Sequence, residues 1–328
     1  GLQASSGIAS RTLASLELSW ENGNAPIKQG DVLVIDEAGM VGTRQMARVS
    51  QKMREIGAKL VLVGDPEQLQ PIEAGTPFRD LVTHHGASQL TEVRRQKYDW
   101  QRQATQDFAV GEISKGIARY DERGAVSKHQ TQDDAIETLA ERYAIDMLSD
   151  AGIGSRIALA HKRLDVHKLN QAIRAALHPQ ATETDDVLLQ TNTGKRAFGA
   201  GDRIVFTRND KDLGVKNGML GTVRKVSANK LIVELDGEAD DHVTFDPRTY
   251  ASFDHGYAVT IHKSQGVTVD EAYVLGSRSM DQHLVYVSMT RHRDGVELLH
   301  SLEDQPRWLR SLEPAWAPAR CRVGPTLA

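Results

Sequence analysis

The sequence contains a single cysteine, Cys321, among its 328 residues. No disulfide can therefore form within the chain, and a reducing, cytosolic setting is expected. No apolar run approaches the roughly 18 residues that a membrane-spanning helix needs, so no such helix is expected. Positive charge is not in excess either, because 40 Lys and Arg against 44 Asp and Glu give a formal net charge of −4. Any nucleic-acid site must then be a local basic groove.

The composition is otherwise that of an ordinary globular protein. Hydrophobic residues make up 40% of the chain and charged residues 26%, which excludes a collagen-like, low-complexity or fully disordered chain. At about 150 residues per domain, the length predicts about two domains.

The first third of the chain alternates between strand and helix. Residues 32–35 and 60–63 are short, continuous apolar runs, and Met46, Val49 and Met53 lie between them at helical spacing. Apolar strands joined by a helix predict a parallel sheet that is covered on both faces. Acidic residues follow both strands, at the carboxyl ends where open α/β sheets bind ligands.

The rest of the chain predicts a second α/β unit with a β-rich insertion. Thr131 is expected to cap a helix, and residues 157–160 form a buried strand. From about 198 to 250, short strands alternate with turns such as Asn217-Gly218, a pattern typical of a small antiparallel barrel. The α/β pattern resumes near residue 257.

The adjacent carboxylates Asp36 and Glu37 follow the first predicted strand directly. This pattern suits a Walker B site, in which the first carboxylate holds Mg²⁺ and the second accepts a proton from the water that attacks a γ-phosphate. The alternative is a strand followed by a solvated acidic turn.

A second strand end carries the sequence GDPEQL at residues 64–69. Gln68 could sense the γ-phosphate and link it to a DNA contact. The alternative is an ordinary Gly-Asp-Pro turn. Two such strand ends in one sheet favour the functional interpretation.

Arginines occur in two further segments, Arg94-Arg95 and, after an apolar stretch, Arg291. A planar, permanently charged guanidinium suits phosphate oxygens, and an arginine finger can contribute about 10³–10⁵ in rate. Taken singly, each arginine is more simply interpreted as a surface or ion-pair residue.

Residues 257–266 combine hydroxyls, an imidazole, an ammonium and an amide around a glycine. This mixture suits contacts to the phosphates of a single strand, although a polar loop between strand and helix is the simpler interpretation. Basic residues of the predicted barrel would help to hold the strand: Arg203, Arg208, Lys216, Arg224 and Lys225.

Together these motifs resemble those of superfamily 1 RecD-like DNA helicases. The ordered segments are DEAGM at 36–40, GDPEQL at 64–69, RRQ at 94–96, TIHKSQG at 260–266 and SMTR at 288–291. The opening segment at 7–17, with VGTRQM at 41–46, is more similar still to the helicase part of TraA-type conjugative relaxases. The resemblance covers roughly residues 1–300.

The resemblance implies an ATP-dependent, 5′-to-3′ DNA helicase or translocase of bacterial conjugation, located in the cytoplasm. ATP and Mg²⁺ are the implied cofactors, and single-stranded DNA and other conjugation proteins the implied partners. Asp36 would hold Mg²⁺, Glu37 would act as base and Gln68 would sense the γ-phosphate. Arg95 and Arg291 would neutralise transition-state charge. The remaining implied contacts are Asp65, Gln265 and Gly266 to the nucleotide, and Thr260, His262, Lys263 and Ser264 to DNA.

The implied fold is α/β, with two RecA-like parallel-sheet domains and an SH3-like β-barrel inserted in the second. The expected ranges are 1–98 for the first motor domain, 99–197 and 253–300 for the second, 198–252 for the barrel and 301–328 for a tail.

One element of the family pattern is missing from the sequence. No P-loop, G-x-x-x-x-G-K-[ST], occurs, because the Gly194-Lys195 pair is followed by Arg196. We therefore expect the chain to be the C-terminal part of a longer protein and to be inactive alone as an ATPase. Two alternatives remain open: a RecD-like repair helicase, and a module that binds single-stranded DNA or a partner without hydrolysing ATP.

Overall fold

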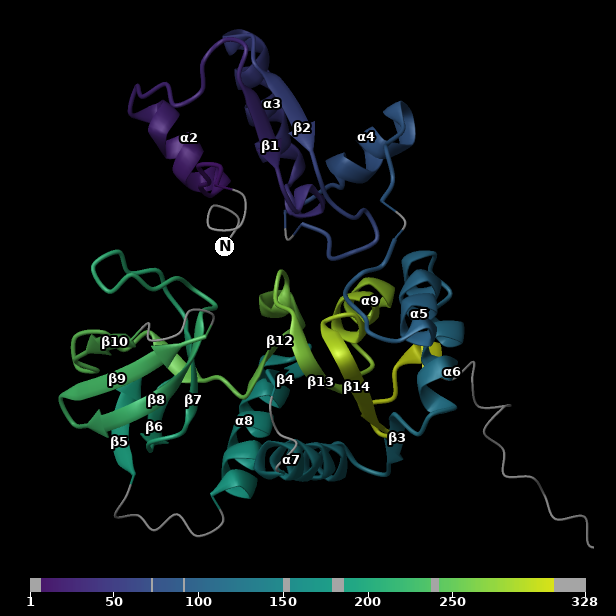
Figure 1. Ribbon diagram of the computed structural model, residues 1–328, viewed down its shortest axis with the longest axis vertical. Coiled ribbons are helices and arrows are strands. Elements are labelled where there is room, and N and C mark those ends of the chain that lie inside the picture. The colour runs from purple at the N-terminus through teal and green to yellow at the C-terminus, as the bar shows by residue number, and fades with distance from the viewer. Residues whose placement is uncertain are drawn as a thin grey trace, which may run out of the picture. The chain divides into compact units, whose positions relative to one another are not determined.

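The computed structural model describes residues 7–71, 73–90, 92–149, 154–178, 186–236 and 242–309. The chain divides into two compact units, Gly1–Thr91 and Glu92–Ala328 (Figure 1). The part of the predicted tail beyond residue 309, with Cys321, lies outside the described residues. Within them, no helix is both long and apolar enough to cross a membrane.

The first unit is built around two parallel strands. Its elements are α2 (Leu13–Glu21), β1 (Val32–Ile35), the 3-10 turn η1 (Ala38–Met40), α3 (Thr43–Ile56), β2 (Lys59–Leu62) and α4 (Pro77–His85). The predicted parallel pairing is confirmed, with Val32 opposite Lys59 and Ile35 opposite Leu62. Gly57 ends α3 in the left-handed conformation, at φ 74°, which glycine adopts without steric cost.

The prediction that this sheet is covered on both faces is wrong for the described residues. Leu33 and Ile35 pack into the core formed with α3 and α4. Val32 and Val34 point to the other face and remain 55% and 54% exposed. Because side chains alternate between the faces of a strand, a continuous apolar run cannot reveal that one face lacks a covering layer.

The second unit contains a five-stranded parallel sheet in the order β12-β4-β13-β14-β3. Helices α7 and α8 pack on it through residues that include Leu139, Tyr143 and Ile173, while α9 contacts β13 and β14 together with α5 and α6 (Figure 1). The elements are α5 (Asp99–Ala109), α6 (Ile113–Asp121), β3 (Val126–His129), α7 (Gln132–Leu148), β4 (Arg156–Ala160), α8 (Arg163–Leu177), β12 (Ala258–Thr260), the 3-10 turn η2 (Ile261–Ser264), β13 (Val269–Leu275), α9 (Gln282–Met289) and β14 (His292–Ser301).

An antiparallel region is inserted between α8 and β12. A five-stranded sheet has the order β10-β9-β8-β7-β11, and β5 and β6 form a separate hairpin. The strands are β5 (Val187–Thr191), β6 (Gly194–Phe198), β7 (Arg203–Phe206), β8 (Leu220–Ser227), β9 (Lys230–Leu235), β10 (His242–Phe245) and β11 (Phe253–His255). Leu189 and Phe198 of the hairpin pack into the same core as Phe206 and Phe253. The antiparallel region therefore begins at Val187, earlier than the residue 198 expected from the sequence.

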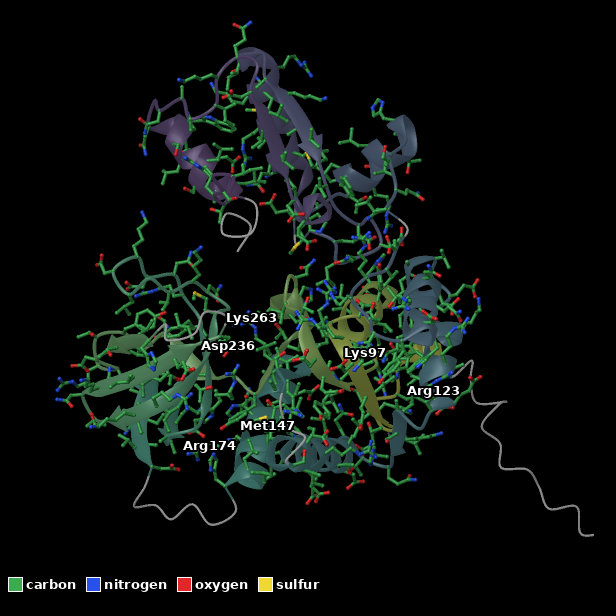
Figure 2. The ribbon with its side chains drawn as sticks, in the orientation of Figure 1. Lys97, Arg123, Met147, Arg174, Asp236 and Lys263 are labelled. Carbon is green, nitrogen blue, oxygen red and sulfur yellow. The ribbon has the colours of Figure 1, made fainter. Side chains whose placement is uncertain are left out.

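A buried carboxylate joins the insertion to the α/β part of the unit. Asp202 is fully buried and accepts hydrogen bonds from the Tyr257 hydroxyl at 2.7 Å and from the Arg174 Nε at 3.0 Å. Arg174, labelled in Figure 2, also pairs with Asp186 at 2.7 Å. Because Arg174 lies on α8 and Tyr257 precedes β12, Asp202 fixes the start of β7 against both elements.

Candidate nucleotide and DNA sites

Two turns at the carboxyl ends of β1 and β2 pack against each other. The Ala38 amide donates to the Val63 carbonyl at 2.9 Å. A Cβ added to Gly64 would lie 2.9 Å from the Ala38 nitrogen, and one added to Gly39 would lie 3.0 Å from the Asp65 carbonyl oxygen. A side chain at either glycine would therefore separate the two backbones. The packing brings the acidic pair after β1 beside the turn that carries Asp65.

The acidic pair itself has a constrained backbone. Glu37 adopts the left-handed conformation, at φ 51° and ψ 40°, which costs a non-glycine residue about 1–3 kcal/mol and is found often at functional sites. Asp36 is exposed, and its Oδ1 accepts from the Glu37 amide at 3.0 Å. One exposed carboxylate fits Mg²⁺, which takes one or two carboxylates and fills its other positions with phosphate and water. The described residues contain no cluster of three metal-ligating side chains.

Gln68 carries a buried acceptor without a donor. Its Nε2 donates to Asp65 Oδ2 at 3.2 Å, and Asp65 Oδ1 accepts from the Glu67 amide at 2.9 Å. The Gln68 Oε1 is buried and has no hydrogen-bond partner in the described part of the chain. Such an atom costs about 1–3 kcal/mol unless a ligand or water satisfies it. A glutamine oxygen of this kind can orient the water that attacks a phosphate.

The register of the second sheet places three strand ends side by side. Thr260 of β12 pairs with Ala160 of β4, and Ala160 pairs with Leu275 of β13. Asn170 on α8 holds the edge strand, because its side-chain amide exchanges two hydrogen bonds of 2.9 Å with the Ala258 backbone. The segments that follow these strands must therefore converge at one edge of the sheet.

His262 and Lys263 are exposed on the turn after β12. Lys263 is labelled in Figure 2. Partial burial lowers the pKa of the His262 imidazole, and the neighbouring His161 lowers it further. Partial burial and the nearby Arg163 also lower the pKa of the Lys263 ammonium. Both side chains can donate hydrogen bonds to phosphate.

Ser264 does not reach the surface of this turn. Its side chain is fully buried and the hydroxyl donates to the Ile261 carbonyl at 2.8 Å. The hydroxyl closes the 3-10 turn that presents His262 and Lys263, and the expectation that Ser264 contacts DNA stays a prediction.

Gln265 and Gly266 complete the turn. Neither the Oε1 nor the Nε2 of Gln265 has a hydrogen-bond partner among the described residues, although both atoms are buried. Gly266 has φ 73°, which favours glycine, and a Cβ there would meet no atom within 4 Å. Gln265, like Gln68, therefore has a buried side-chain amide that a bound ligand could satisfy.

Arg95 and Arg291 come together around Thr290. The Arg95 guanidinium donates to the Thr290 carbonyl at 2.8 Å. Arg291 is 2% exposed, and it donates from Nε to the Val287 carbonyl at 2.9 Å. Gln96 donates to the carbonyls on both sides of Arg291, at 3.3 and 3.1 Å. The structure thus brings together two arginines that the sequence places in distant motifs.

Sequence reasoning missed two residues of the carboxyl edge. The His161 Nδ1 lies 2.8 Å from the Ser279 Oγ, and the His161 ring lies 5.8 Å from the ring of His262. The position of His161 directly after the predicted strand 157–160 was the available signal.

The basic residues expected on the insertion are partly neutralised. Arg203 pairs with Asp236, and Arg224 pairs with Glu234. The Arg208 guanidinium lies 5.9 Å from the centre of the Tyr250 ring. The insertion therefore offers less unpaired positive charge than its sequence suggests.

Comparison with known proteins places these features in context. The AAA domain family matches residues 1–131. Conjugal transfer protein TraA of Agrobacterium fabrum is 44% identical over 302 residues, which are 92% of this chain and 27% of TraA. The RecBCD enzyme subunit RecD of Mycolicibacterium smegmatis is 30% identical over 292 residues, which are 82% of this chain and 50% of RecD. The chain thus spans about a quarter of the TraA relative.

A solved structure shares the fold. The Pif1 helicase from Bacteroides, in complex with ADP-AlF3 and single-stranded DNA, superposes with a TM-score of 0.57 at 18% sequence identity. The match covers 94% of this chain and 79% of the Pif1 chain. The α/β fold with parallel sheets is therefore that of known helicase structures.

Proposed function

We propose that this chain, a homologue of the TraA conjugal transfer proteins with a RecD-like AAA helicase domain, is the DNA-translocating part of a conjugative relaxase. In this proposal it uses ATP hydrolysis to move 5′-to-3′ along single-stranded DNA during plasmid transfer. The two parallel-sheet parts act as RecA-like motor domains, and the antiparallel insertion acts as an SH3-like module of the second. Other conjugation proteins are the proposed partners.

The observation that carries the proposal is the packing of the two turns in the first unit. Glycines at 39 and 64 let the backbones touch, and this contact sets Asp36 and Glu37 beside Asp65 and Gln68. An acidic pair and an amide with an unsatisfied acceptor supply three of the groups that phosphoryl transfer to water uses, namely a Mg²⁺ ligand, a base and a group that orients the water.

Each of these groups has a proposed role. Asp36 holds Mg²⁺, which supplies charge neutralisation for the phosphates. Glu37 accepts the proton of the attacking water. Gln68 accepts a hydrogen bond from that water, and Asp65 fixes the Gln68 amide through the bond to its Nε2.

In the second unit, the proposed nucleotide contacts are Arg95, Arg291, Gln265 and Gly266. The arginines stabilise charge that develops on the transferred phosphoryl group. The unsatisfied amide of Gln265 supports a direct polar contact, and Gly266 allows the backbone to approach the ligand.

The proposed DNA contacts are Thr260, His262 and Lys263. These residues lie on a turn at the carboxyl edge of a parallel sheet, where hydroxyl, imidazole and ammonium groups can bind successive phosphates. Such contacts carry no base information and depend on salt.

Two alternative functions remain testable. A RecD-like repair helicase has less support, because identity to RecD is 30% against 44% to TraA. The second is a module that binds single-stranded DNA or a partner without hydrolysing ATP; the printed sequence contains no G-x-x-x-x-G-K-[ST] motif. We accordingly predict that the chain alone binds single-stranded DNA but shows no DNA-stimulated ATP hydrolysis.

The DNA-binding part of the proposal is tested by fluorescence anisotropy with labelled single-stranded and duplex oligonucleotides at several salt concentrations. We expect tighter binding of the single strand. The double variant Thr260→Ala, His262→Ala should weaken it about a hundredfold or more, because hydrogen bonds to a charged group contribute about 1.5–3 kcal/mol each. The matched control is Thr244→Ala, His242→Ala on β10. Equal affinity for both DNA forms, or equal affinities of the two double variants, would refute these contacts.

A further inference from the structure

A cavity of about 810 Å³ lies at the carboxyl edge of the second sheet. Its walls come from the segment after β13, the start of α9, the turn between α5 and α6, and Arg307 and Trp308. The volume lies within the range of about 300–1,000 Å³ that small-molecule sites occupy, so it can accept one nucleobase.

Trp308 forms an aromatic part of the wall and is held at two points. Its indole Nε1 donates to the Met280 carbonyl at 3.2 Å, and its main-chain carbonyl accepts from the Ser114 hydroxyl at 3.3 Å. The side chain is therefore positioned before any ligand arrives. A fixed indole suits base stacking, which loses little entropy on a rigid surface.

Side-chain contacts link one wall of the cavity to the proposed DNA turn. Ser279 lines the cavity and lies 2.8 Å from His161 Nδ1. The His161 ring in turn lies 5.8 Å from the ring of His262. His161 and Ser279 thus lie between His262, a proposed phosphate contact, and the cavity.

The charges at the cavity fit a phosphodiester linkage. Arg278 lines it and is 60% exposed, although it pairs with Asp304 at 3.6 Å. Arg307 contributes a second guanidinium. The wall also holds two carboxylates, Glu112 and Asp281, and Asp281 caps α9 by accepting from the Leu284 amide at 2.9 Å. The phosphate is therefore placed on the side of Arg278 and Arg307.

We propose that this cavity is a base-binding subsite for the single strand, in which one nucleobase stacks on Trp308 while an adjacent phosphate contacts Arg278 and Arg307. The subsite rests on the proposed function, because it continues the strand path that begins at His262. It would give the protein a stacking contact in addition to phosphate contacts, and so a preference for unpaired bases over duplex.

The test compares an oligothymidine with a strand of the same length made of abasic sites, each labelled and titrated with the chain in anisotropy experiments. The wild type should bind the oligothymidine more tightly. Trp308→Ala should weaken oligothymidine binding on the order of tenfold and leave abasic-strand binding unchanged, while Trp308→Phe should retain most of the affinity. Arg307→Ala should weaken both strands and lower the salt dependence, whereas Arg248→Ala, in an exposed pair with Asp246, should change neither.

Several results would overturn the subsite. Equal wild-type affinities for both strands would do so, as would a Trp308→Phe variant that is folded by circular dichroism but weakens both strands equally. If His262→Ala weakens binding and Trp308→Ala does not, this inference fails and the proposed function stands. If the wild type binds neither strand, both fail.

Discussion

The Arg95 guanidinium donates to the main-chain carbonyl of Thr290 at 2.8 Å, although the two residues are 195 positions apart. Arg95 comes from the segment before α5, and Thr290 ends α9 directly before Arg291. A backbone bond between the Lys97 amide and the Arg293 carbonyl, at 2.9 Å, continues the contact. These two contacts hold the segment that contains Arg95 against the segment that contains Arg291.

The first prediction concerns these arginines in a protein in which the chain is joined to a P-loop segment. Arg291→Ala should reduce ATP turnover on the order of 10³-fold with little change in ATP affinity, because an arginine finger meets charge that develops in the transition state. Steady-state kinetics measure both parameters. Arg293→Ala, an exposed neighbour paired with Asp270, is the control. Normal turnover in the Arg291 variant would remove it from the site.

The second prediction concerns the buried Asp202. Asp202→Ala should lower the free energy of unfolding by about 3–5 kcal/mol, since it leaves the half-buried Arg174 with fewer partners and removes the acceptor of the Tyr257 hydroxyl. Urea unfolding followed by circular dichroism measures the change. Asp212→Ala, an exposed aspartate of the same insertion, should stay within about 0.5 kcal/mol of wild type. If both substitutions changed the free energy of unfolding by similar amounts, Asp202 would not be what holds the insertion to α8 and β12.

The third prediction concerns the pH dependence of stability. Burial raises the pKa of the Glu271 carboxyl from 4.5 to about 7, and the nearby Asp294 and Asp146 add to the shift. Between these values the unfolded chain ionises first, so stability should fall as pH rises from 4.5 to 7 and stay lower above it. Glu271→Gln removes this loss. It should stabilise the protein by about 1–2 kcal/mol above pH 7, after allowance for partial solvent exposure, and by nothing below pH 4.5. Thermal unfolding of the wild type and the Glu271→Gln variant measures the change. A difference in unfolding temperature between the two proteins that stays constant from pH 4.5 to 7 would contradict the assignment.

The fourth prediction uses the uncovered face of the first sheet. Val34 is 54% exposed and Val49 is fully buried. Val34→Ala should change the free energy of unfolding by less than about 0.5 kcal/mol, whereas Val49→Ala should cost about 1–3 kcal/mol because it leaves a cavity. Urea unfolding of the matched pair measures both. An equal cost would mean that the β1 face is covered in solution.

Local sequence patterns predicted much of the fold correctly. The parallel pairing of β1 and β2 follows from two apolar runs joined by a helix. The start of α7 follows from Thr131, whose hydroxyl accepts from the Asp134 amide as expected of a cap. These features depend on residues that are close in the sequence, where periodicity and capping act.

Features that depend on distant segments could not be predicted in this way. The β5–β6 hairpin contains Lys195 and Arg196, and its residues do not alternate simply between apolar and polar. Only the folded structure shows that the hairpin packs into the core of the insertion. The buried position of Ser264 depends on the closure of η2. The cavity at Trp308 is lined by three segments, 111–114, 278–283 and 307–308, and none of them alone predicts it.

The most direct test of the account is the single-strand-stimulated ATPase activity of the P-loop-joined protein with Glu37→Gln, measured beside Glu67→Gln as control. Glu67 lies in the neighbouring turn and pairs with Arg79 at 3.5 Å, so the same substitution there alters charge without removing the proposed base. The account predicts strong stimulation by single-stranded DNA in the wild type and the Glu67 variant, and a loss of about 10²-fold or more in the Glu37 variant. Stimulated hydrolysis that survives Glu37→Gln would contradict it.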